Sequence, residues 1–583
     1  MATAYNRNAL RLWGWWMLVF VLVLSACAAP DSSAIGSGGR AGEQRPGRTK
    51  TLNLAITTNV TAMGPITQST PTGGWGGIHE VHSQGLITTA KTSTLVGRLA
   101  ERVPSVADGS VSVLADGRMR VVYHLRKGVT WQDGAPFTAH DLTFSFKPLV
   151  NYAVSGNGMV GMMESVEATD DNTVAFTYRA PHYLGNVLLI NKFWPLPRHI
   201  LEPAYEGTVT SGNPDEFINH PYWTTEYVHL GPFRLTAFDP GVGLQFHAYE
   251  GNFLGRPKVD VINVRVFANE NSAVAEVLAG TIDMFMAYAL SDELIGEVKA
   301  RWERDGGGTV HSRPDVTRSL YPQMRPDYQR EPANLDPRVR GALYQAIDRD
   351  GVASVRGAQV AWSILPPGDL LYEATKDGLR RYPYDPERAS AALRDLGWAP
   401  GPDGILRNSA DGRRFQTQFS MLPNQYWVMP VVADFWRRIG LAVEEILIPA
   451  ALARDGEHRS TYPGWEESSG GYADAFLNRF QGPAATAPRW GGNRGGYDDP
   501  TANALAARYS VSLSERDQFQ AMKAINDFFV EMLPSLSLYF SAEFLGKRRG
   551  VIAFDDVEGS GPGSANRLGS ESRNSYLWDI QQG

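Results

Sequence analysis

The stretch Val121–Phe146 decides how the rest of the chain is interpreted, and it reads VVYHLRKGVTWQDGAPFTAHDLTFSF. Its first residues alternate with the period of two that a β-strand requires. Gly128 and the pair Asp133–Gly134 interrupt this run, which indicates turns. Thr138 and Asp141 have the spacing of a capping box, with Asp in place of the usual Glu or Gln. The stretch therefore predicts a strand, a turn and a capped helix, although periodicity alone would also suit any ordinary unit of this kind.

The sequence motifs within this stretch are more specific evidence than its periodicity. In residues 124–146, His-Leu-Arg-Lys-Gly-Val, Trp-x-Asp-Gly, Pro-Phe-Thr-Ala and Asp-Leu-x-Phe-Ser-Phe follow one another in order. This pattern resembles the signature of the family 5 extracellular solute-binding proteins, which are receptors of ABC importers for oligopeptides, dipeptides, nickel or sugars. Further words that resemble this family follow at Gly231–Leu235, Tyr249–Lys258, Gly280–Asp283 and Val339–Arg349. The resemblance extends over nearly the whole chain, from residue 52 to residue 554.

The resemblance implies an α/β protein with the type II periplasmic-binding fold (cluster C-like), in which a hinge joins two lobes and an extra domain is inserted. Mapped on this chain, lobe I takes residues 51–84, 195–315 and 538–583, domain II takes residues 85–194, and lobe III takes residues 316–537. Two crossover segments connect lobes I and III. The opening stretch falls in domain II, where the resemblance implies a structural role and no ligand contact.

The amino terminus is a targeting segment and not part of the fold. Arginines precede an apolar run at Leu12–Leu24, and Leu24–Cys27 reads Leu-Ser-Ala-Cys, which resembles a bacterial lipobox. We therefore expect residues 1–26 to be a lipoprotein signal peptide and Cys27 to carry diacylglycerol. Residues 27–50 would form a lipidated, flexible tether. A plain secretory signal with an incidental cysteine is the alternative.

The composition indicates a globular, exported protein. The chain has 583 residues, of which 43% are hydrophobic and 20% charged, so it can bury a large core. A formal net charge of −7 without a basic stripe argues against a nucleic-acid partner. The single cysteine excludes an internal disulfide, and no apolar run after the leader reaches the roughly 20 residues of a transmembrane helix. We expect a monomer, anchored by lipid to the membrane on its extracytoplasmic face, in the periplasm or on the outer surface of the cell membrane.

One candidate ligand anchor follows from the resemblance. In peptide-binding members, an aspartate within a W-x-A-D-Y-like word holds the α-ammonium of the ligand, and Gly471–Ala475 matches this word at its Ala-Asp pair. This implies that Asp474 is the anchor, with Tyr472 beside it, whereas a helix-cap or loop aspartate is the alternative. Two departures weaken the peptide assignment: Ala475 replaces the usual aromatic residue, and Ser468 lies where one oligopeptide receptor has a basic group for the peptide carboxylate. An oligosaccharide has no charged tail, so it would not need this basic group.

Two further groups of residues are candidate ligand contacts. The polar, Gly-rich run at residues 58–77 follows the first expected strand and is typical of a binding loop, with a mobile surface loop as the alternative. Its candidate contacts are Asn59, Trp75 and Gly76. In the expected lobe III, three indole rings near loop-like sequence are placed to stack on sugars or apolar side chains. Since most of the 15 tryptophans of the chain must be core residues, we expect one of these three to contact ligand. The three are Trp427, Trp465 and Trp490.

Motifs for other functions are weak. Gly156–Gly161 fits the dinucleotide fingerprint G-x-G-x-x-G, but no expected strand leads into it, and the chain has no phosphate-binding G-x-x-x-x-G-K-[ST]. Any ATPase must therefore be another chain. His79 and His82 lie three residues apart without the further ligands that a zinc site needs. We expect no metal and no cofactor. A secreted hydrolase is the alternative from another class, and neither G-x-S-x-G nor H-E-x-x-H supports it.

These observations predict a binding protein and not an enzyme. The expected function is capture of an oligopeptide or dipeptide in a cleft between the lobes, with an oligosaccharide or another small solute as the alternative. Ligand that bridges both lobes would shift an open form toward a closed form. The closed form would dock on an ABC permease that works with separate ATPase subunits.

Overall fold

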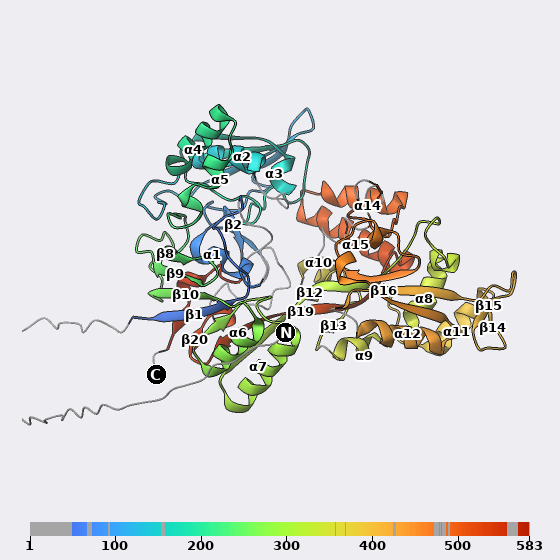
Figure 1. Cartoon of the computed structure of the whole chain (residues 1–583). Helices are drawn as coiled ribbons and strands as arrows, with labels where there is room; N and C mark the ends of the chain where they lie inside the picture. Colours follow the sequence, from blue (N-terminus) through green and yellow to red (C-terminus); the bar gives the residue numbers. More distant parts are fainter. Residues whose placement is uncertain are drawn as a thin grey trace, which may run out of the picture. The chain divides into compact units, whose positions relative to one another are not determined.

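The computed structural model describes residues 49–583, without residues 67–72, 91–93, 153–157, 356, 368, 424–426, 471–476, 478–479, 481–485, 488–489, 557–569 and 582–583. Residues Thr49–Gly583 form one compact unit. Its main sheet has 11 strands in the order β17-β16-β18-β12-β19-β11-β1-β10-β9-β8, with β13 paired to β19 (Figure 1). Helices lie between these strands in the sequence, so the predicted α/β class is confirmed.

The first part of the main sheet is built around β1 (Thr51–Ile56), whose alternating leucines and isoleucine predicted a strand. β1 pairs in parallel with β10 (Val261–Val266) on one side and β11 (Met284–Phe285) on the other. Two helices cover this part, because their apolar faces share one buried cluster with Ala55 and Phe285. The remaining elements are β8 (Phe233–Asp239), β9 (Gly243–Ala248), α6 (Glu270–Ala279) and α7 (Asp292–Asp305).

A second sheet, with the order β4-β5-β7-β6, contains the stretch that opened the sequence analysis. The predicted strand is β5 (Met119–His124), and the predicted helix is α2 (Ala139–Tyr152). The Thr138 backbone N–H donates to Asp141 Oδ2 at 2.8 Å, which is the predicted capping interaction. The core of this sheet is continuous with that of the β1 part. The other strands are β4 (Val111–Val113), β6 (Met163–Asp170) and β7 (Thr173–Tyr178).

The far end of the main sheet has its own core and its own helices. Asp336 caps α8 and Asp385 caps α11, as their Asp-Pro pairs predicted, and each carboxylate accepts a backbone N–H of the first turn. The strands are β16 (Gln416–Met421), β17 (Ala442–Leu447) and β18 (Trp465–Ser469). The helices are α8 (Pro337–Gln345), α9 (Arg349–Ser354), α11 (Pro386–Asp395) and α12 (Val428–Arg438).

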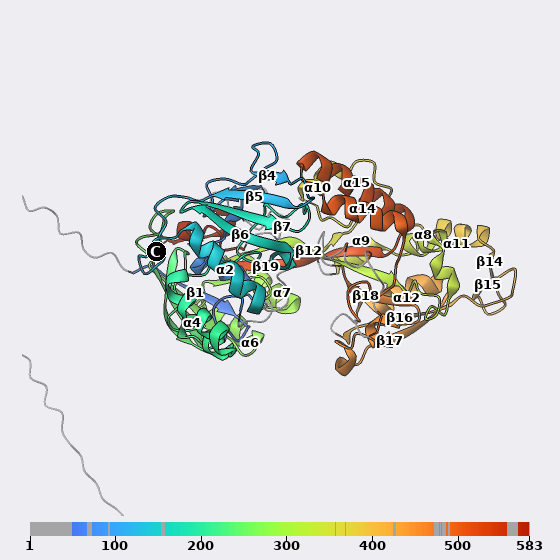
Figure 2. The same ribbon diagram turned by 90° about the horizontal axis from the view of Figure 1, so that it is seen from above.

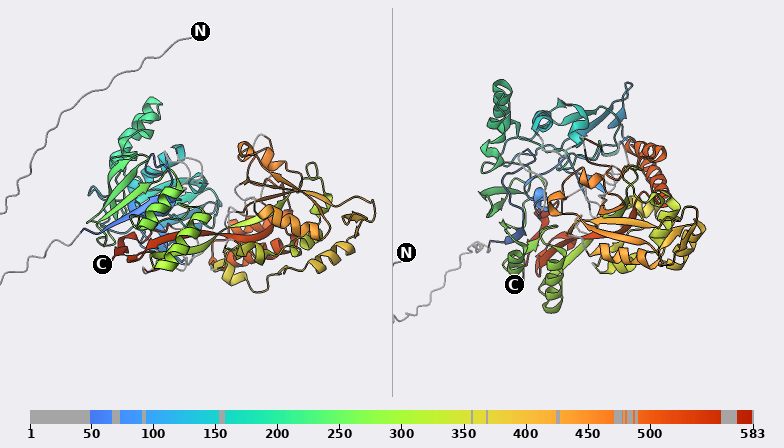
Figure 3. Two further views of the ribbon diagram at one scale, coloured as in Figure 1. Left: turned by 60° about the horizontal axis from the view of Figure 1, so that its bottom comes forward. Right: turned by 45° about the vertical axis from the view of Figure 1, so that its right-hand side comes forward.

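Two long strands, β12 (Gly308–Pro322) and β19 (Leu536–Arg548), join the two ends of the main sheet. They pair antiparallel from Gly308↔Arg548 to Leu320↔Leu536, and Figures 2 and 3 show them running from the β1 part to the β18 part. The lobe division inferred from the sequence placed a crossover near residue 315, which lies within β12. The pairing is irregular between Pro314 and Thr317, where β12 has one more residue than β19, as in a β-bulge.

A contact also connects the region after the second sheet with a helical layer made of α10 (Leu370–Thr375), α14 (Pro500–Ser510) and α15 (Glu515–Met532). The Tyr183 backbone N–H donates to the carbonyl of Ser510 at 2.9 Å. The rings of Tyr183 and Tyr509 lie 4.6 Å apart between centroids. Tyr183 is therefore buried in the apolar cluster of this helical layer.

Short elements complete the fold. Within the described ranges, no helix combines the length and the apolar character needed to cross a bilayer. The short helices are α1 (His79–His82), α3 (Gly158–Met162) and α5 (Asp215–Ile218), and α4 (Arg198–Ser211) is longer. The short strands are β2 (Ile87–Thr89), β3 (Leu95–Gly97), β13 (Gln359–Val360), β14 (Trp398–Pro400), β15 (Leu406–Asn408), β20 (Val551–Ile552) and β21 (Asp579–Ile580).

Candidate binding site

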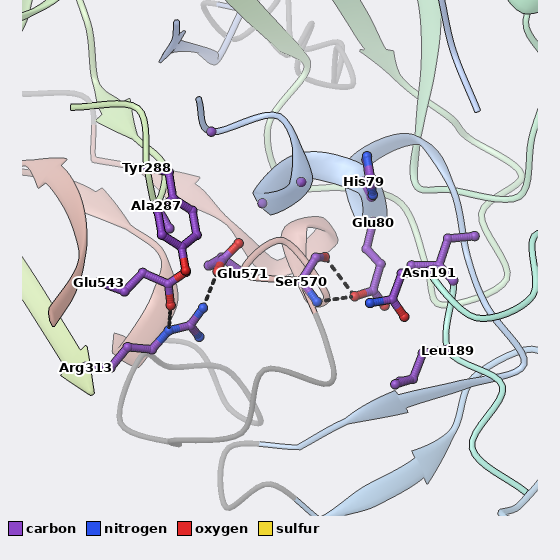
Figure 4. A pocket seen from close by; sticks show the side chains of 14 residues that line it. His79, Glu80, Leu189, Asn191, Ala287, Tyr288, Arg313, Glu543, Ser570 and Glu571 are labelled. Carbon is purple, nitrogen blue, oxygen red and sulfur yellow. Dashed lines mark hydrogen bonds and ion pairs between the residues drawn. The ribbon is translucent and has the colours of Figure 1, made fainter. Parts of the chain in front are cut away.

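A cavity of about 190 Å³ lies where β12 and β19 meet the Gly-rich loop that follows β1 (Figure 4). Segments that are far apart in the sequence meet here, as expected of a site that the fold assembles. The lining combines apolar residues and glycines with three carboxylates and one guanidinium, and Tyr288, Arg313, Glu543 and Glu571 form its charged side. The lining residues are Gly74, Gly76, Gly77, His79, Glu80, Leu189, Ile190, Asn191, Ala287, Tyr288, Arg313, Glu543, Ser570 and Glu571.

Arg313 holds the charged side of the cavity together. It stands opposite Glu543 in the β12–β19 register, and its guanidinium forms ion pairs with both Glu543 and Glu571. The three side chains are only 3%, 4% and 7% exposed, respectively. Burial raises the pKa of Glu543, and the attraction of Arg313 opposes this rise. Burial lowers the pKa of Arg313, but pairing with both carboxylates outweighs it and leaves that pKa raised.

Glu80 connects the start of the fold with its carboxyl-terminal segment. Its carboxylate accepts the backbone N–H of Ser570 at 3.1 Å, the Ser570 hydroxyl at 2.8 Å and the Thr88 hydroxyl at 2.8 Å. The carboxylate is buried, and these three donors replace the water that it loses. Glu80 therefore fixes the position of the cavity wall made by residues 570–571.

Three imidazole rings lie at the cavity or next to it: His79 lines the cavity, and His82 and His229 are fully buried. His82 stacks between Trp75 and Phe246, with ring centroids 5.5 Å from each. Burial lowers the pKa of His79 to about 4 and that of His229 to about 3, and it lowers the pKa of His82 well below the usual value. These rings are neutral at pH 7. No group of three or more metal-binding side chains occurs among the described residues.

Acid is expected to destabilise the fold through these histidines. As pH falls below about 6.5, histidines of the unfolded chain take up protons while the buried ones stay neutral, so the free energy of unfolding decreases. For each fully buried ring, His82 and His229, the expected loss between pH 8 and pH 5 is about 2 kcal/mol. Urea unfolding of His229→Gln should show a pH dependence shallower by this amount. The exposed His124→Gln is the control, and an unchanged pH dependence in His229→Gln would contradict the assignment.

The structure describes five of the predicted ligand contacts outside the cavity lining. Trp75 and Trp465 are fully buried, so in this conformation their ring faces are covered by protein and are not offered to a solute. Trp465 packs on Trp436 at 5.3 Å between ring centroids. Trp465 lies near loop-like sequence, which did not show that it belongs to β18 and that its side chain is buried in the core.

The remaining described candidates are partly or fully exposed. Trp427 and Trp490 are half-buried, and Trp427 lies beside Tyr539 with 6.0 Å between ring centroids. Asn59 is exposed. It lies near Gly241, which belongs to the turn between β8 and β9. The Gly-rich loop does reach the cavity, but through Gly74, Gly76 and Gly77. Of the residues that the sequence analysis named in this loop, Gly76 lines the cavity, and contact of the loop with a ligand stays a prediction.

Tyr472 and Asp474 lie outside the described residues, as does Cys27, but the strand that leads to the first two is described. β18 pairs antiparallel with β12, and the Gly470 backbone N–H donates to the carbonyl of Thr317 at 2.7 Å. Thr317 is four residues from Arg313 along β12, which corresponds to at most about 13 Å. Gly470, the last described residue before Asp474, therefore pairs with β12 close to the cavity.

The structure places a cation near Ser468. The sequence has Ser468 at the position of a basic group, which suggested that a partner for a peptide carboxylate was missing. Arg494 Nη2 donates to Ser468 Oγ at 3.0 Å and lies 3.6 Å from Glu466, so a guanidinium from later in the chain occupies this region. No local sequence motif predicts this arrangement, because the guanidinium comes from a loop that is separated from Ser468 in the sequence.

Sequence reasoning also missed the residues that form the charged side of the cavity. Tyr288, Arg313, Glu543 and Glu571 come from four separate segments, and none belongs to a word with known spacing. Only the register of β12 with β19 brings Arg313 opposite Glu543. Pairing between strands so far apart in the sequence cannot be read from local periodicity.

Comparison with known protein families agrees with the fold and the sequence words. The family model described as "Bacterial extracellular solute-binding proteins, family 5 Middle" matches residues 94–488. The curated dipeptide-binding protein of Escherichia coli (strain K12) is 25% identical over 435 residues, which are 69% of this chain and 76% of that protein.

Solved structures share the fold over most of the chain. The oligopeptide-binding protein from Thermus thermophilus, complexed with a pentapeptide, has a TM-score of 0.61 and 20% identity, and the match covers 91% of this chain and 98% of that chain. NikZ from Campylobacter jejuni, in complex with Ni(L-His), has a TM-score of 0.64 and 18% identity, and the match covers 91% and 99%. These structures confirm the predicted fold. Because their ligands differ, the fold does not select the solute.

Proposed function

Because the chain belongs to family 5 of the bacterial extracellular solute-binding proteins, we propose that it captures a peptide and delivers it to the permease of an ABC importer. Members of this family are extracytoplasmic binding proteins rather than enzymes. The observation that carries the proposal is the cavity beside Arg313 together with Gly470, the last described residue before Asp474, which pairs with the same strand, β12. A solute between these two elements would contact both ends of the main sheet.

Charges at the two ends of a peptide have candidate partners in this region. Asp474 would hold the α-ammonium, as the sequence resemblance implies, with Tyr472 beside it. Arg494 would face the carboxylate, because its guanidinium occupies the region of Ser468. A neutral oligosaccharide would use neither charge, so Arg494 favours the peptide over the sugar.

The proposed mechanism is closure of two lobes around the peptide. In the proposed division, lobe I contains the Arg313 cavity and lobe III contains residues 471–476, and both connections between them lie in β12 and β19. Contacts made only in the closed form shift the equilibrium, and a shift from 1:99 to 99:1 requires about 5.5 kcal/mol of differential affinity. The bulge at Pro314–Thr317 supports a hinge here, since a β-bulge interrupts regular pairing.

The proposed partners are the permease, with its separate ATPase subunits, and the membrane itself. Acylated Cys27 would hold the monomeric protein at the extracytoplasmic face, and residues 27–50 would give it reach. Mass spectrometry of the amino-terminal peptide from the native protein measures this directly: a diacylglyceryl mass on Cys27 supports the anchor, and an unmodified thiol contradicts it.

The function is tested by direct binding. Native mass spectrometry of the purified protein with equimolar di- to pentapeptides, gluco-oligosaccharides and a nickel–histidine complex should retain peptides, and calorimetry should then give micromolar or tighter dissociation constants. Peptides must be recovered intact after incubation. Retention of the sugar or the nickel complex alone would replace the peptide proposal, and cleaved peptides would show an enzyme.

A further inference from the structure

Tyr288 is set apart from its neighbours by its backbone and its exposure. Its φ is 63°, in the left-handed region that bulky residues rarely adopt. Met286, Ala287 and Ala289 are buried around it, whereas Tyr288 is 50% exposed. The Ala289 carbonyl accepts the Thr57 hydroxyl at 3.0 Å, which holds this turn against the end of β1. The fold therefore fixes a strained turn that presents one aromatic side chain.

The hydroxyl of Tyr288 is engaged with the charged side of the cavity. It hydrogen-bonds Glu543, which in turn pairs with Arg313 (Figure 4). Since the polar end of the side chain points at Glu543, the exposed part is mainly the carbon ring. A ring whose orientation is already fixed loses little conformational freedom when a ligand packs on it.

The surroundings of the ring indicate what it would bind. Tyr288 lines the cavity together with Ala287, Leu189, Ile190 and the glycines of the loop after β1. These groups offer apolar surface and backbone, and a ring beside them suits a flat apolar group. Strain in a bulky residue at a cavity rim is one way that binding sites are organised.

We propose that Tyr288 is a specificity-determining residue that stacks on an aromatic side chain of the bound peptide. This inference rests on the proposed peptide-binding function and adds the class of side chain that the cavity selects. Aromatic pairs of this kind change affinity by about 2- to 12-fold.

The test compares five probes: tetra-alanine and the four tetrapeptides in which one alanine is replaced by phenylalanine. Calorimetry of the wild type should show at least one phenylalanine peptide bound about 2- to 12-fold more tightly than tetra-alanine. Tyr288→Gly should abolish this preference while its melting temperature stays equal or rises, because glycine accepts a positive φ without strain. A residue with only a structural role would show the reverse, a lower melting temperature with the preference retained.

Two further variants test whether the ring of Tyr288, and not its hydroxyl or the loss of any exposed tyrosine, determines the preference. Tyr288→Phe keeps the ring and should keep the preference, and Tyr384→Ala removes a tyrosine that is 43% exposed outside the cavity lining and should change nothing. If wild type binds peptides without an aromatic preference, or Tyr288→Gly retains it, the assignment of Tyr288 is wrong. If wild type binds none of the five peptides but retains a sugar or nickel complex, the proposed function fails first, and that result is distinct from a failure of Tyr288 alone.

Discussion

Replacing Arg313 with methionine is expected to lower the free energy of unfolding by about 3 to 5 kcal/mol at pH 7. Arg313 lies between Glu543 and Glu571, and all three side chains are almost fully buried. Methionine fills much of the same volume but removes the cation that both carboxylates share. Two buried carboxylates that lose this cation cost far more than the lost packing. Urea unfolding, followed by tryptophan fluorescence, measures the change.

Two comparisons identify the cause of the loss. The triple variant Arg313→Met, Glu543→Gln, Glu571→Gln should recover most of the stability, because no buried charge remains unpaired. Arg118→Met breaks ion pairs with Asp116 and Glu164 at an exposed site and should have little effect. The loss in Arg313→Met should also shrink at acidic pH, as Glu543, whose pKa is raised by burial, becomes protonated. A triple variant no more stable than Arg313→Met would show that packing is what the substitution disturbs.

Replacing Asp474 with alanine is expected to weaken peptide binding by some hundreds-fold or more. If this carboxylate pairs with a buried α-ammonium, its removal costs about 3 to 5 kcal/mol, at 1.4 kcal/mol per tenfold change in affinity. The expectation combines the sequence word at Gly471–Ala475 with the start of that segment on β18 beside β12. Calorimetry with the tightest peptide from the binding screen measures the effect.

The matched control for this prediction is Asp411→Ala, at the tip of the turn after β15, which should leave affinity unchanged. Acetylation of the peptide's amino terminus should weaken binding to wild type as strongly as the substitution does, and should cost Asp474→Ala little more. Peptide affinity within a few fold of wild type in Asp474→Ala would remove this residue from the anchoring role.

Local patterns predicted the elements that depend on local physics. The capping interaction of Thr138 with Asp141, the Asp-Pro starts of α8 and α11, and the full extent of α15 all follow from spacing within a few residues. β12 escaped prediction because Pro314 and the charged residues around it interrupt the alternation of a strand. The structure accommodates Pro314 at the irregular part of the pairing, where a missing N–H donor costs least.

The candidate site was less predictable because long-range pairing assembles it. The loop after β1, predicted as a binding loop, lines the cavity through its glycines, whereas its Trp75 packs on His82. Arg494 reaches Ser468 from a separate loop, so the local sequence around Ser468 could not predict this cation. Side chains that meet only in the folded protein have no fixed spacing in the sequence that a motif search could recognise.

The pairing of Gly470 with Thr317 gives a length scale for a solute that would span this region, because Thr317 and Arg313 lie at most about 13 Å apart along β12. A fully extended dipeptide is about 7 Å long and a tetrapeptide about 13 Å. The distance along β12 from Arg313 to Thr317 matches the longer molecule. If the proposed peptide lies along β12, peptides of three to five residues should be retained in preference to dipeptides, and molecular length as well as side-chain chemistry would govern retention.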